Sequence, residues 1–217
     1  MLKAATSQLR HWQGKFGKEY TDRNALTLED MDKRYQGHYG VTRTELNEAF
    51  LGDFERSIRI LEVGSNIGNQ LLLLQKMGFE NLYGIEINGY VVQQSKANTC
   101  NINIIQGSAF DIPFKDGFFD LVFTSGVLIH IVPSDIQKVL MEIHRCTNEY
   151  IWGFEYYADT YTEVKYRGHD ELLWKTDFGR LYLDSLDGLK LVKEKRVKYL
   201  EDDNVDTMFL MRKRSAE

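Results

Sequence analysis

The chain has little cysteine, little proline and no long hydrophobic run. Its 217 residues include two cysteines and two prolines. Two cysteines exclude a disulfide-rich scaffold and a four-cysteine zinc site. The apolar runs fall short of the roughly 18 residues that a transmembrane helix needs, and the first residues lack the apolar stretch of a secretory signal. We therefore expect a cytoplasmic protein that does not enter membranes.

An excess of positive charge is also missing. The 27 Lys and Arg residues stand against 32 Asp and Glu residues, which gives a net charge of −5. This balance argues against binding to nucleic acid or to acidic membranes. The five histidines contain no His-x-x-x-His pair, so no metal site is expected. The length favours one domain with a substantial core and leaves the oligomeric state open.

Short apolar runs alternate with segments of helical spacing between residues 58 and 154. The runs are residues 58–64, 82–87, 102–105, 119–124 and 150–154, and the helical segments are residues 69–77, 90–99 and 134–145. This alternation is typical of a parallel sheet with helices on both faces, a doubly wound α/β fold. Two later runs, 189–200 and 207–212, flank an acidic turn and predict a C-terminal antiparallel hairpin.

The beginning of the chain lacks this alternation, and its sequence predicts polar helices to about residue 54. We expect residues 1–55 to form an N-terminal helical lid and residues 56–217 to form the sheet domain. Ser134, just after Pro133, is expected to cap the helix that follows it.

A glycine-rich turn follows the first predicted strand, between Gly64 and Gly68. It lacks the dinucleotide fingerprint, because Asn66 stands where that pattern needs a glycine. No Gly-Lys-Ser or Gly-Lys-Thr follows, so it is not a phosphate-binding P-loop. Glu62 would repel a pyrophosphate but would attract the ammonium of an amino acid. These residues therefore favour S-adenosylmethionine, which has a methionine end and no phosphate.

Glu86 ends the second predicted strand, 22 residues after Gly64. A carboxylate at that place can accept hydrogen bonds from both hydroxyls of an adenosine ribose. Taken together and in this order, the glycine turn and the acid predict a nucleoside cofactor.

A third segment, residues 106–130, contains Asp111-Ile-Pro-Phe, Phe119-Asp-Leu-Val and His130. With the first two segments it resembles the class I S-adenosylmethionine-dependent methyltransferases, over about residues 57–214. The resemblance implies a Rossmann-like, seven-stranded sheet, mostly parallel, with an antiparallel C-terminal hairpin. It also implies S-adenosylmethionine as the cofactor.

The same resemblance implies roles for individual residues. Glu62, Gly64, Ser65, Asn66 and Gly68 would shape the methionine side; Glu86 would bind the ribose; Ile87, Ser108, Ala109 and Phe110 would border the adenine; and Thr124, Ser125 and Gly126 would contact the methionine end. Ser108 departs from the family pattern, in which an aspartate commonly accepts from the adenine amino group.

A closer resemblance lies outside these general motifs. Residues 12–23, Trp152-Gly-Phe-Glu-Tyr-Tyr157 and Tyr166-Arg-Gly-His-Asp170 look like the pseudaminic acid biosynthesis-associated methylase family. This implies a small polar acceptor, a sialic-acid-like sugar or its precursor. It also implies that Trp12, Phe16 and Tyr20 close over the cofactor, with Arg23 near the methionine carboxylate. Alternatively, these aromatic residues only dock the N-terminal helix.

The acceptor is expected beyond the carboxyl end of the fifth strand, where an aromatic insertion covers about residues 155–175. The residues expected to bind it are Tyr156, Tyr157, Tyr166, Arg167 and Trp174. The alternative is an aromatic packing segment with a charged edge. A hydroxyl acceptor needs a general base, and the candidates are Glu155, His130 and His169.

Two other functions stay open. Tyrosines and acids near Glu155 would also suit a cationic acceptor, so the chain could be an N-methyltransferase of another small amine or guanidino metabolite. It could also be a non-catalytic subunit that binds the nucleoside without transferring a methyl group.

Overall fold

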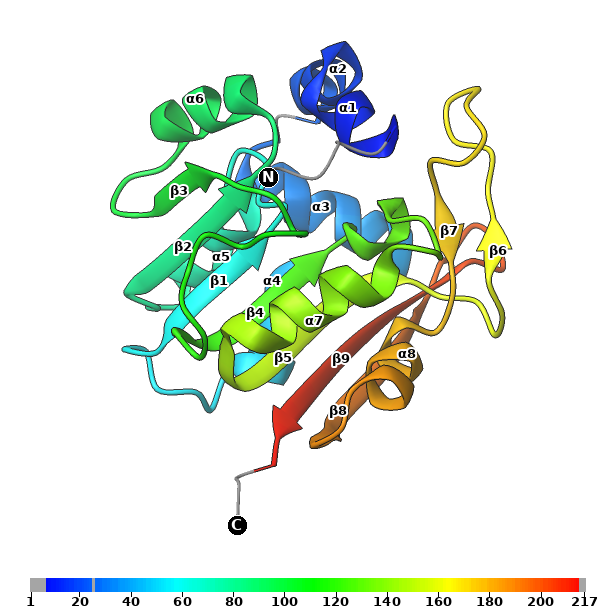
Figure 1. The fold of residues 1–217 in the computed structure, drawn as a ribbon. Helices are drawn as coiled ribbons and strands as arrows, with labels where there is room; N and C mark the ends of the chain where they lie inside the picture. Colours follow the sequence, from blue (N-terminus) through cyan, green and yellow to red (C-terminus); the bar gives the residue numbers. More distant parts are fainter. Residues whose placement is uncertain (1–6, 25, 215–217) are drawn as a thin grey trace.

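The computed structural model describes residues 7–24 and 26–214, and within them one large sheet organises the chain (Figure 1). Its seven strands lie in the order β3-β2-β1-β4-β5-β9-β8. The five strands β3, β2, β1, β4 and β5 run parallel to one another, whereas β9 pairs antiparallel with both β5 and β8. The predicted doubly wound sheet with its C-terminal antiparallel hairpin is therefore confirmed.

The strands of the large sheet follow the predicted apolar runs closely. They are β1 (Arg59–Val63), β2 (Asn81–Glu86), β3 (Asn103–Gln106), β4 (Phe119–Ser125), β5 (Thr147–Tyr156), β8 (Leu189–Lys198) and β9 (Val205–Lys213). A small separate hairpin pairs β6 (Thr162–Glu163) with β7 (Trp174–Lys175) inside the aromatic insertion.

Helices connect the strands and cover both faces of the sheet. They are α1 (Ser7–Gln13), α2 (Lys15–Arg23), α3 (Leu28–Tyr39), α4 (Arg43–Leu51), α5 (Asn69–Lys76), α6 (Gly89–Asn98), the short 3-10 helix η1 (Leu128–His130), α7 (Ile136–Cys146) and α8 (Phe178–Ser185). Helix α3 ends at Gly40, which is left-handed at φ 70°. Helix α4 then begins with a capping box between Thr42 and Glu45.

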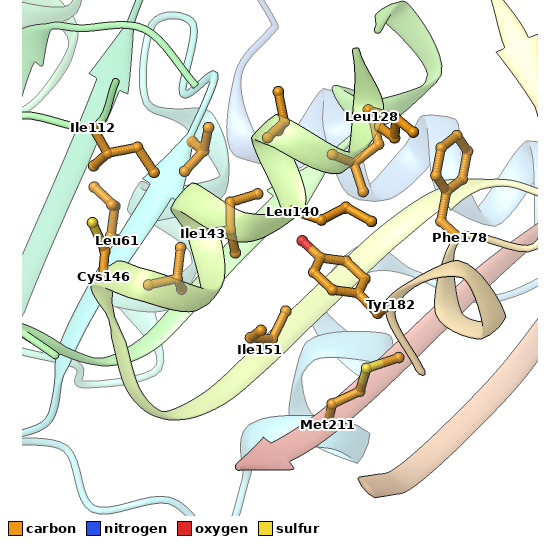
Figure 2. Close-up of a cluster of buried hydrophobic side chains, with 14 of the residues drawn as sticks. Leu61, Ile112, Leu128, Leu140, Ile143, Cys146, Ile151, Phe178, Tyr182 and Met211 are labelled. Atoms are coloured by element: carbon orange, nitrogen blue, oxygen red, sulfur yellow. The ribbon is translucent and has the colours of Figure 1, made fainter. Parts of the chain in front are cut away.

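Each face of the sheet buries its own core. Figure 2 shows Leu140 and Ile143 of α7 and Tyr182 of α8 packed around Ile151 of β5. The second core joins the opposite face to α4 and α5. Successive side chains of one strand enter the two cores alternately, as the pleat of a strand requires; Ile151 enters the first and Trp152 the second.

The structure corrects one local prediction and adds elements that the sequence pattern did not reveal. The residue preceding α7 is Asp135 rather than Ser134, and no side-chain cap is made there within the described residues. Helix α8 and the β6–β7 hairpin were not anticipated; α8 begins where the carboxylate of Asp177 accepts from the backbone of Arg180. Across the described ranges, no helix combines the length and the apolar character needed to cross a membrane.

Candidate functional site

A cavity of about 490 Å³ opens at the carboxyl ends of β1, β2, β4 and β5. Helices α1 and α2 lie over this edge, next to α6 (Figure 1). Its lining includes Trp12, Tyr20, Tyr35, Tyr39, Glu62, Gly64, Ser65, Asn66, Glu86, Ile87, Ala109, Phe110, Ser125, Gly126, His130, Tyr156, Tyr166, Tyr199 and Asp206. A volume of this size suits a small-molecule ligand.

The glycine turn forms one wall of the cavity. Gly64 has φ 75°, and a Cβ atom there would lie 2.6 Å from Cγ2 of Val127. Only glycine therefore fits, because any side chain would be strained and would collide with the loop after β4. Gly68, with φ 85°, is equally tight against Ile104 and Thr99 and serves packing rather than lining the cavity. Its place at the start of α5 is the one that the sequence predicts.

Glu86 stands at the end of β2 with its carboxylate held by two loops. Oε2 accepts from the backbone N–H of Asn66 at 3.0 Å, and Oε1 accepts from that of Asn88 at 2.9 Å. Burial raises the pKa of Glu86, and these backbone N–H groups oppose the rise. Each oxygen keeps acceptor capacity for one further donor. The carboxylate is thus fixed in place beside the cavity and can accept two hydroxyl groups.

Glu62, at the end of β1, is almost fully buried at 2% exposure and borders the same cavity. Its Oε2 has no hydrogen-bond partner within the described ranges, and neither does the hydroxyl of Ser65. Burial raises the pKa of Glu62 well above its usual range, which the nearby Arg43 opposes. A buried acceptor without a donor is costly. A ligand that brings a cationic donor to Glu62 would therefore be stabilised here.

Arg43 is a residue that the sequence pattern did not single out. It is fully buried, and it donates to Tyr35 at 3.0 Å and to the hydroxyl of Ser125 at 3.2 Å. Its guanidinium also lies 4.7 Å from the ring centre of Phe154. The charge lies directly behind the cavity wall and supports Tyr35 and Ser125. Its position at the start of α4 looks like an ordinary helix surface in the sequence.

The N-terminal helices cover the cavity. Trp12 and Tyr20 line it, and their rings contact each other at 5.4 Å between centres. Phe16 contacts Trp12 from outside, at 5.2 Å. The side-chain amide of Asn88 donates to the carbonyl of Trp12 at 2.9 Å, and Thr21 donates to the side chain of Asn66 at 3.0 Å. The lid is thereby joined to the same two loops that hold Glu86.

Arg23, predicted near the methionine carboxylate, is not among the residues that line the cavity. Its side chain is 41% exposed on α2 and lies 3.9 Å from Glu19. Arg23 is the last residue of α2, and its side chain extends toward Glu19, one turn earlier on the exposed surface of the helix. Two other arginines lie closer to the cavity: Arg34 lines it, and Arg43 donates to Ser125 from behind the wall.

The third sequence segment contributes part of its predicted residues to the cavity. Ala109 and Phe110 line it next to Ile87, and so do Ser125 and Gly126. The hydroxyl of Ser108 accepts from the backbone N–H of Phe110 at 3.2 Å and so stabilises its own turn. Thr124 is buried and directs its hydroxyl to Glu155.

Among the three predicted bases, Glu155 takes a structural position. It is 1% exposed, and its Oε1 accepts from the backbone N–H of Val127 at 3.1 Å beneath η1. Burial raises its pKa to about 7. Phe154 and Tyr156 face the cavity, so alternation along β5 turns Glu155 to the other face.

His130 does line the cavity, between Trp12 and Tyr166. Its Nδ1 donates to the carbonyl of Leu172 at 2.7 Å, which leaves Nε2 as an acceptor. Burial lowers the pKa of His130 to about 4, so the imidazole is neutral near pH 7. His169 is exposed and contacts His11 at 4.8 Å between ring centres.

The aromatic insertion supplies two of the five predicted acceptor residues to the cavity, Tyr156 and Tyr166. Trp174 is 6% exposed and belongs to the β6–β7 hairpin. Tyr157 donates to Asp159, and the guanidinium of Arg167 lies over the ring of Tyr166, on the outer side. The insertion is therefore partly a wall of the cavity and partly a packing segment.

A cluster around Asp206 was missed by sequence reasoning. Tyr39, Tyr156, Tyr199 and Asp206 come from α3, β5, the turn after β8 and the start of β9, and all line the cavity. One signal was available: Tyr35 and Tyr39 are four residues apart and share a helix face. Nothing in the sequence pattern marks Asp206, which reads as part of an acidic turn. Across residues 7–24 and 26–214, no group of three His, Cys, Asp or Glu side chains is arranged to hold a metal ion.

Comparisons with known proteins agree with this geometry. Residues 61–149 match the family model described as methyltransferase domain. An uncharacterized methyltransferase of Synechocystis sp. is 29% identical over 87 residues, which make up 40% of this chain and 41% of that protein. The chain thus spans less than half of that relative's length. These matches confirm the predicted resemblance to methyltransferases for the stretch from β1 to the start of β5.

Two solved structures extend the similarity over the rest of the chain. The 1,6-didemethyltoxoflavin N1-methyltransferase of Burkholderia thailandensis, solved with 1,6-didemethyltoxoflavin and S-adenosylhomocysteine, superposes with a TM-score of 0.70 at 14% identity, covering 99% of this chain and 94% of that one. The magnesium protoporphyrin IX methyltransferase of Synechocystis, solved with S-adenosylmethionine, gives a TM-score of 0.68 at 13% identity, covering 98% and 100%. At such identities the similarity shows the fold alone, a Rossmann-like sheet that this chain shares with these two proteins.

Proposed function

We propose that the chain is an S-adenosylmethionine-dependent methyltransferase acting on a small polar metabolite. The observation that carries this proposal is the pair of acids Glu62 and Glu86 in one cavity, with the glycine turn between them. The methyltransferase family match over residues 61–149 supports it. S-adenosylmethionine supplies an electrophilic methyl group on a sulfonium centre.

The residues on this wall of the cavity fit that cofactor. The unpartnered Oε2 of Glu62 and the hydroxyl of Ser65 suit an ammonium group, as judged over the described chain. Glu86 is oriented to accept both ribose hydroxyls. Ile87, Ala109 and Phe110 provide an apolar border for the adenine. Trp12 and Tyr20 act as the lid, which excludes water and holds donor and acceptor together.

The acceptor that we propose is a sialic-acid-like sugar of the pseudaminic acid type or its precursor. The resemblance of residues 12–23 and 166–170 to that methylase family supports this choice. Several tyrosines also line the cavity, and their hydroxyls suit a ligand with several hydroxyl and amino groups. Positioning in this enclosed site is the main contribution we expect from the protein.

Isothermal titration with S-adenosylmethionine and S-adenosylhomocysteine tests the cofactor. We expect binding by the parent protein and a loss of roughly ten- to hundredfold in Glu86→Ala, because a charge-assisted contact to two hydroxyls disappears. Glu80→Ala is the matched control, since Glu80 is exposed and precedes the same strand. Folded parent protein that gives no heat with either compound would contradict the proposal.

Transfer of labelled methyl to a set of amino sugars, sugar nucleotides and nine-carbon sugar acids tests the acceptor. We expect labelling of a member of the pseudaminic acid series. Labelling of small amines or guanidino compounds alone would favour the other enzyme hypothesis. Cofactor binding without transfer to any acceptor would favour a non-catalytic subunit.

A further inference from the structure

The four residues of the Asp206 cluster, Tyr39, Tyr156, Tyr199 and Asp206, are linked by hydrogen bonds. The hydroxyls of Tyr39 and Tyr199 donate to Oδ2 of Asp206 at 2.5 Å and 3.2 Å. The two hydroxyl oxygens are 3.0 Å apart, and Tyr156 bonds to Tyr199. These links fix the carboxylate at one end of the cavity.

Asp206 has an unsatisfied oxygen at this position. The residue is 1% exposed and lines the cavity, and its Oδ1 has no hydrogen-bond partner in the described chain. Burial raises the pKa of Asp206 to about 6, so the carboxyl is mainly ionised at pH 7. A buried anionic oxygen without a donor is costly unless a ligand supplies one.

The neighbouring cations do not supply that donor. Lys175 Nζ donates to Asn204, and Arg43 donates to Tyr35, Ser125 and Asn47. Both positive charges attract the Asp206 carboxylate from a distance and lower its pKa. Among the described residues, however, neither forms an ion pair with Asp206 within 4.0 Å. Direct charge compensation at Oδ1 is therefore left to a ligand.

The rings around Asp206 suit a cation as well. Tyr39 and Tyr199 have ring centres 4.7 Å apart, whereas Tyr35 and Phe154 already have the guanidinium of Arg43 over their rings. Aromatic faces attract an ammonium group, and the attraction is stronger where water is excluded. A neutral hydroxyl gains less from these rings, because the attraction to an aromatic face requires a positive charge.

We propose that the Asp206 cluster is the subsite that anchors the acceptor through a protonated amino group, with Oδ1 of Asp206 receiving the ammonium. The inference rests on the proposed function, because the ligand is the methyl acceptor of the same cavity. It narrows the acceptor class to molecules that carry a primary or secondary amine, of which an amino sugar is one kind. Asp206 acts here as a binding and specificity residue.

The test compares 2-phenylethylamine with its matched alcohol, 2-phenylethanol, by titration against the full chain with and without S-adenosylhomocysteine. We expect the parent to prefer the amine by roughly ten- to hundredfold, which is the range for a hydrogen bond to a charged group. Asp206→Asn should remove the preference. Asp203→Asn, an equal charge change at an exposed position three residues earlier, should keep it.

A second variant tests the role of Asp206 without replacing the residue itself. Tyr39→Phe removes one hydroxyl that holds down the pKa of Asp206, so amine binding should begin at a higher pH than in the parent, where the midpoint is near pH 6. The titratable and charged groups that face Asp206 are Tyr39, Tyr156, Tyr199, Arg43 and Lys175, with His38 beside the tyrosine rings. Because His38 lies against the rings of Tyr39 and Tyr199, the series is repeated in His38→Gln.

The inference is overturned if the amine and the alcohol bind equally, if neither binds, or if Asp206→Asn keeps the amine preference. Its failure is separable from failure of the proposed function. Binding of S-adenosylhomocysteine without amine preference defeats only this inference. Amine preference that depends on Asp206, without any binding of S-adenosylhomocysteine, defeats only the cofactor assignment.

Discussion

The two ends of the cavity are built in different ways. The glycine-loop end consists of Glu62, Glu86 and residues 64–68, and backbone N–H groups and close packing hold it. The tyrosine end consists of Tyr39, Tyr156, Tyr199 and Asp206, and side-chain hydrogen bonds hold it, one of them joining residues 167 positions apart. The first end tolerates few side chains, whereas the second depends on side chains that come from distant parts of the chain.

The largest effect is expected from Gly64→Val at the glycine-loop end. The left-handed backbone and the 2.6 Å approach to Val127 should together lower the free energy of unfolding by roughly 2–5 kcal/mol. Urea denaturation measures the change, and titration measures the loss of cofactor binding. Gly188→Val is the control: φ there is also positive, at 76°, and the added Cβ meets no described atom within 4 Å, so it should cost only about 1–2 kcal/mol. If both variants lose the same free energy of unfolding, the predicted collision with Val127 does not occur.

Arg43 connects the two ends, because its charge acts on both Glu62 and Asp206. Arg43→Met keeps the volume but leaves Tyr35, Ser125 and Asn47 without their donor. We expect a loss of roughly 2–4 kcal/mol in the free energy of unfolding, measured by urea denaturation. Arg56→Met, a half-buried arginine over the ring of Phe79, should cost less. If Arg56→Met lowers the free energy of unfolding more than Arg43→Met does, the buried charge of Arg43 contributes little to stability.

Asp206→Asn should stabilise the protein, in contrast to both changes above. The pKa of Asp206 in the folded chain, about 6, is above the ordinary aspartate value of about 3.9. The folded state therefore loses stability as the pH rises from about 4 to above 6, and it carries the full penalty above that range. The variant should gain roughly 1–3 kcal/mol at pH 8 and almost nothing at pH 4. Denaturation of Asp203→Asn at both pH values should show no such difference.

The smallest effect is expected from Arg23→Ala. Its exposed pair with Glu19 should be worth no more than about 0.5 kcal/mol, and its distance from the cavity should leave cofactor affinity within about twofold of the parent. Titration with S-adenosylhomocysteine measures the cofactor affinity. A loss of tenfold or more would restore Arg23 to the methionine site and would mean that α2 moves when the ligand binds.

The strands, their parallel order and the glycine-loop end could be read from the sequence. Each depends on neighbours in the chain: apolar runs of strand length, a turn that only glycine permits at Gly64, and an acid at the strand end at Glu86. Local backbone geometry then determines where these side chains lie. Periodicity carries the same local information, so alternation along β5 already places Tyr156, and not Glu155, beside Phe154 on the cavity side.

Only the tertiary structure decided the tyrosine end. Tyr39, Tyr199 and Asp206 lie on a helix and a hairpin that are far apart in the sequence, and their shared site arises because β9 pairs with β5 and α3 crosses the carboxyl edge. The tertiary structure also buried Arg43 and left Arg23 exposed on α2. The sequence determined the elements and the glycine-loop end, since both follow from short-range sterics. The tyrosine end depends on long-range packing, in which residues with no local signature become neighbours.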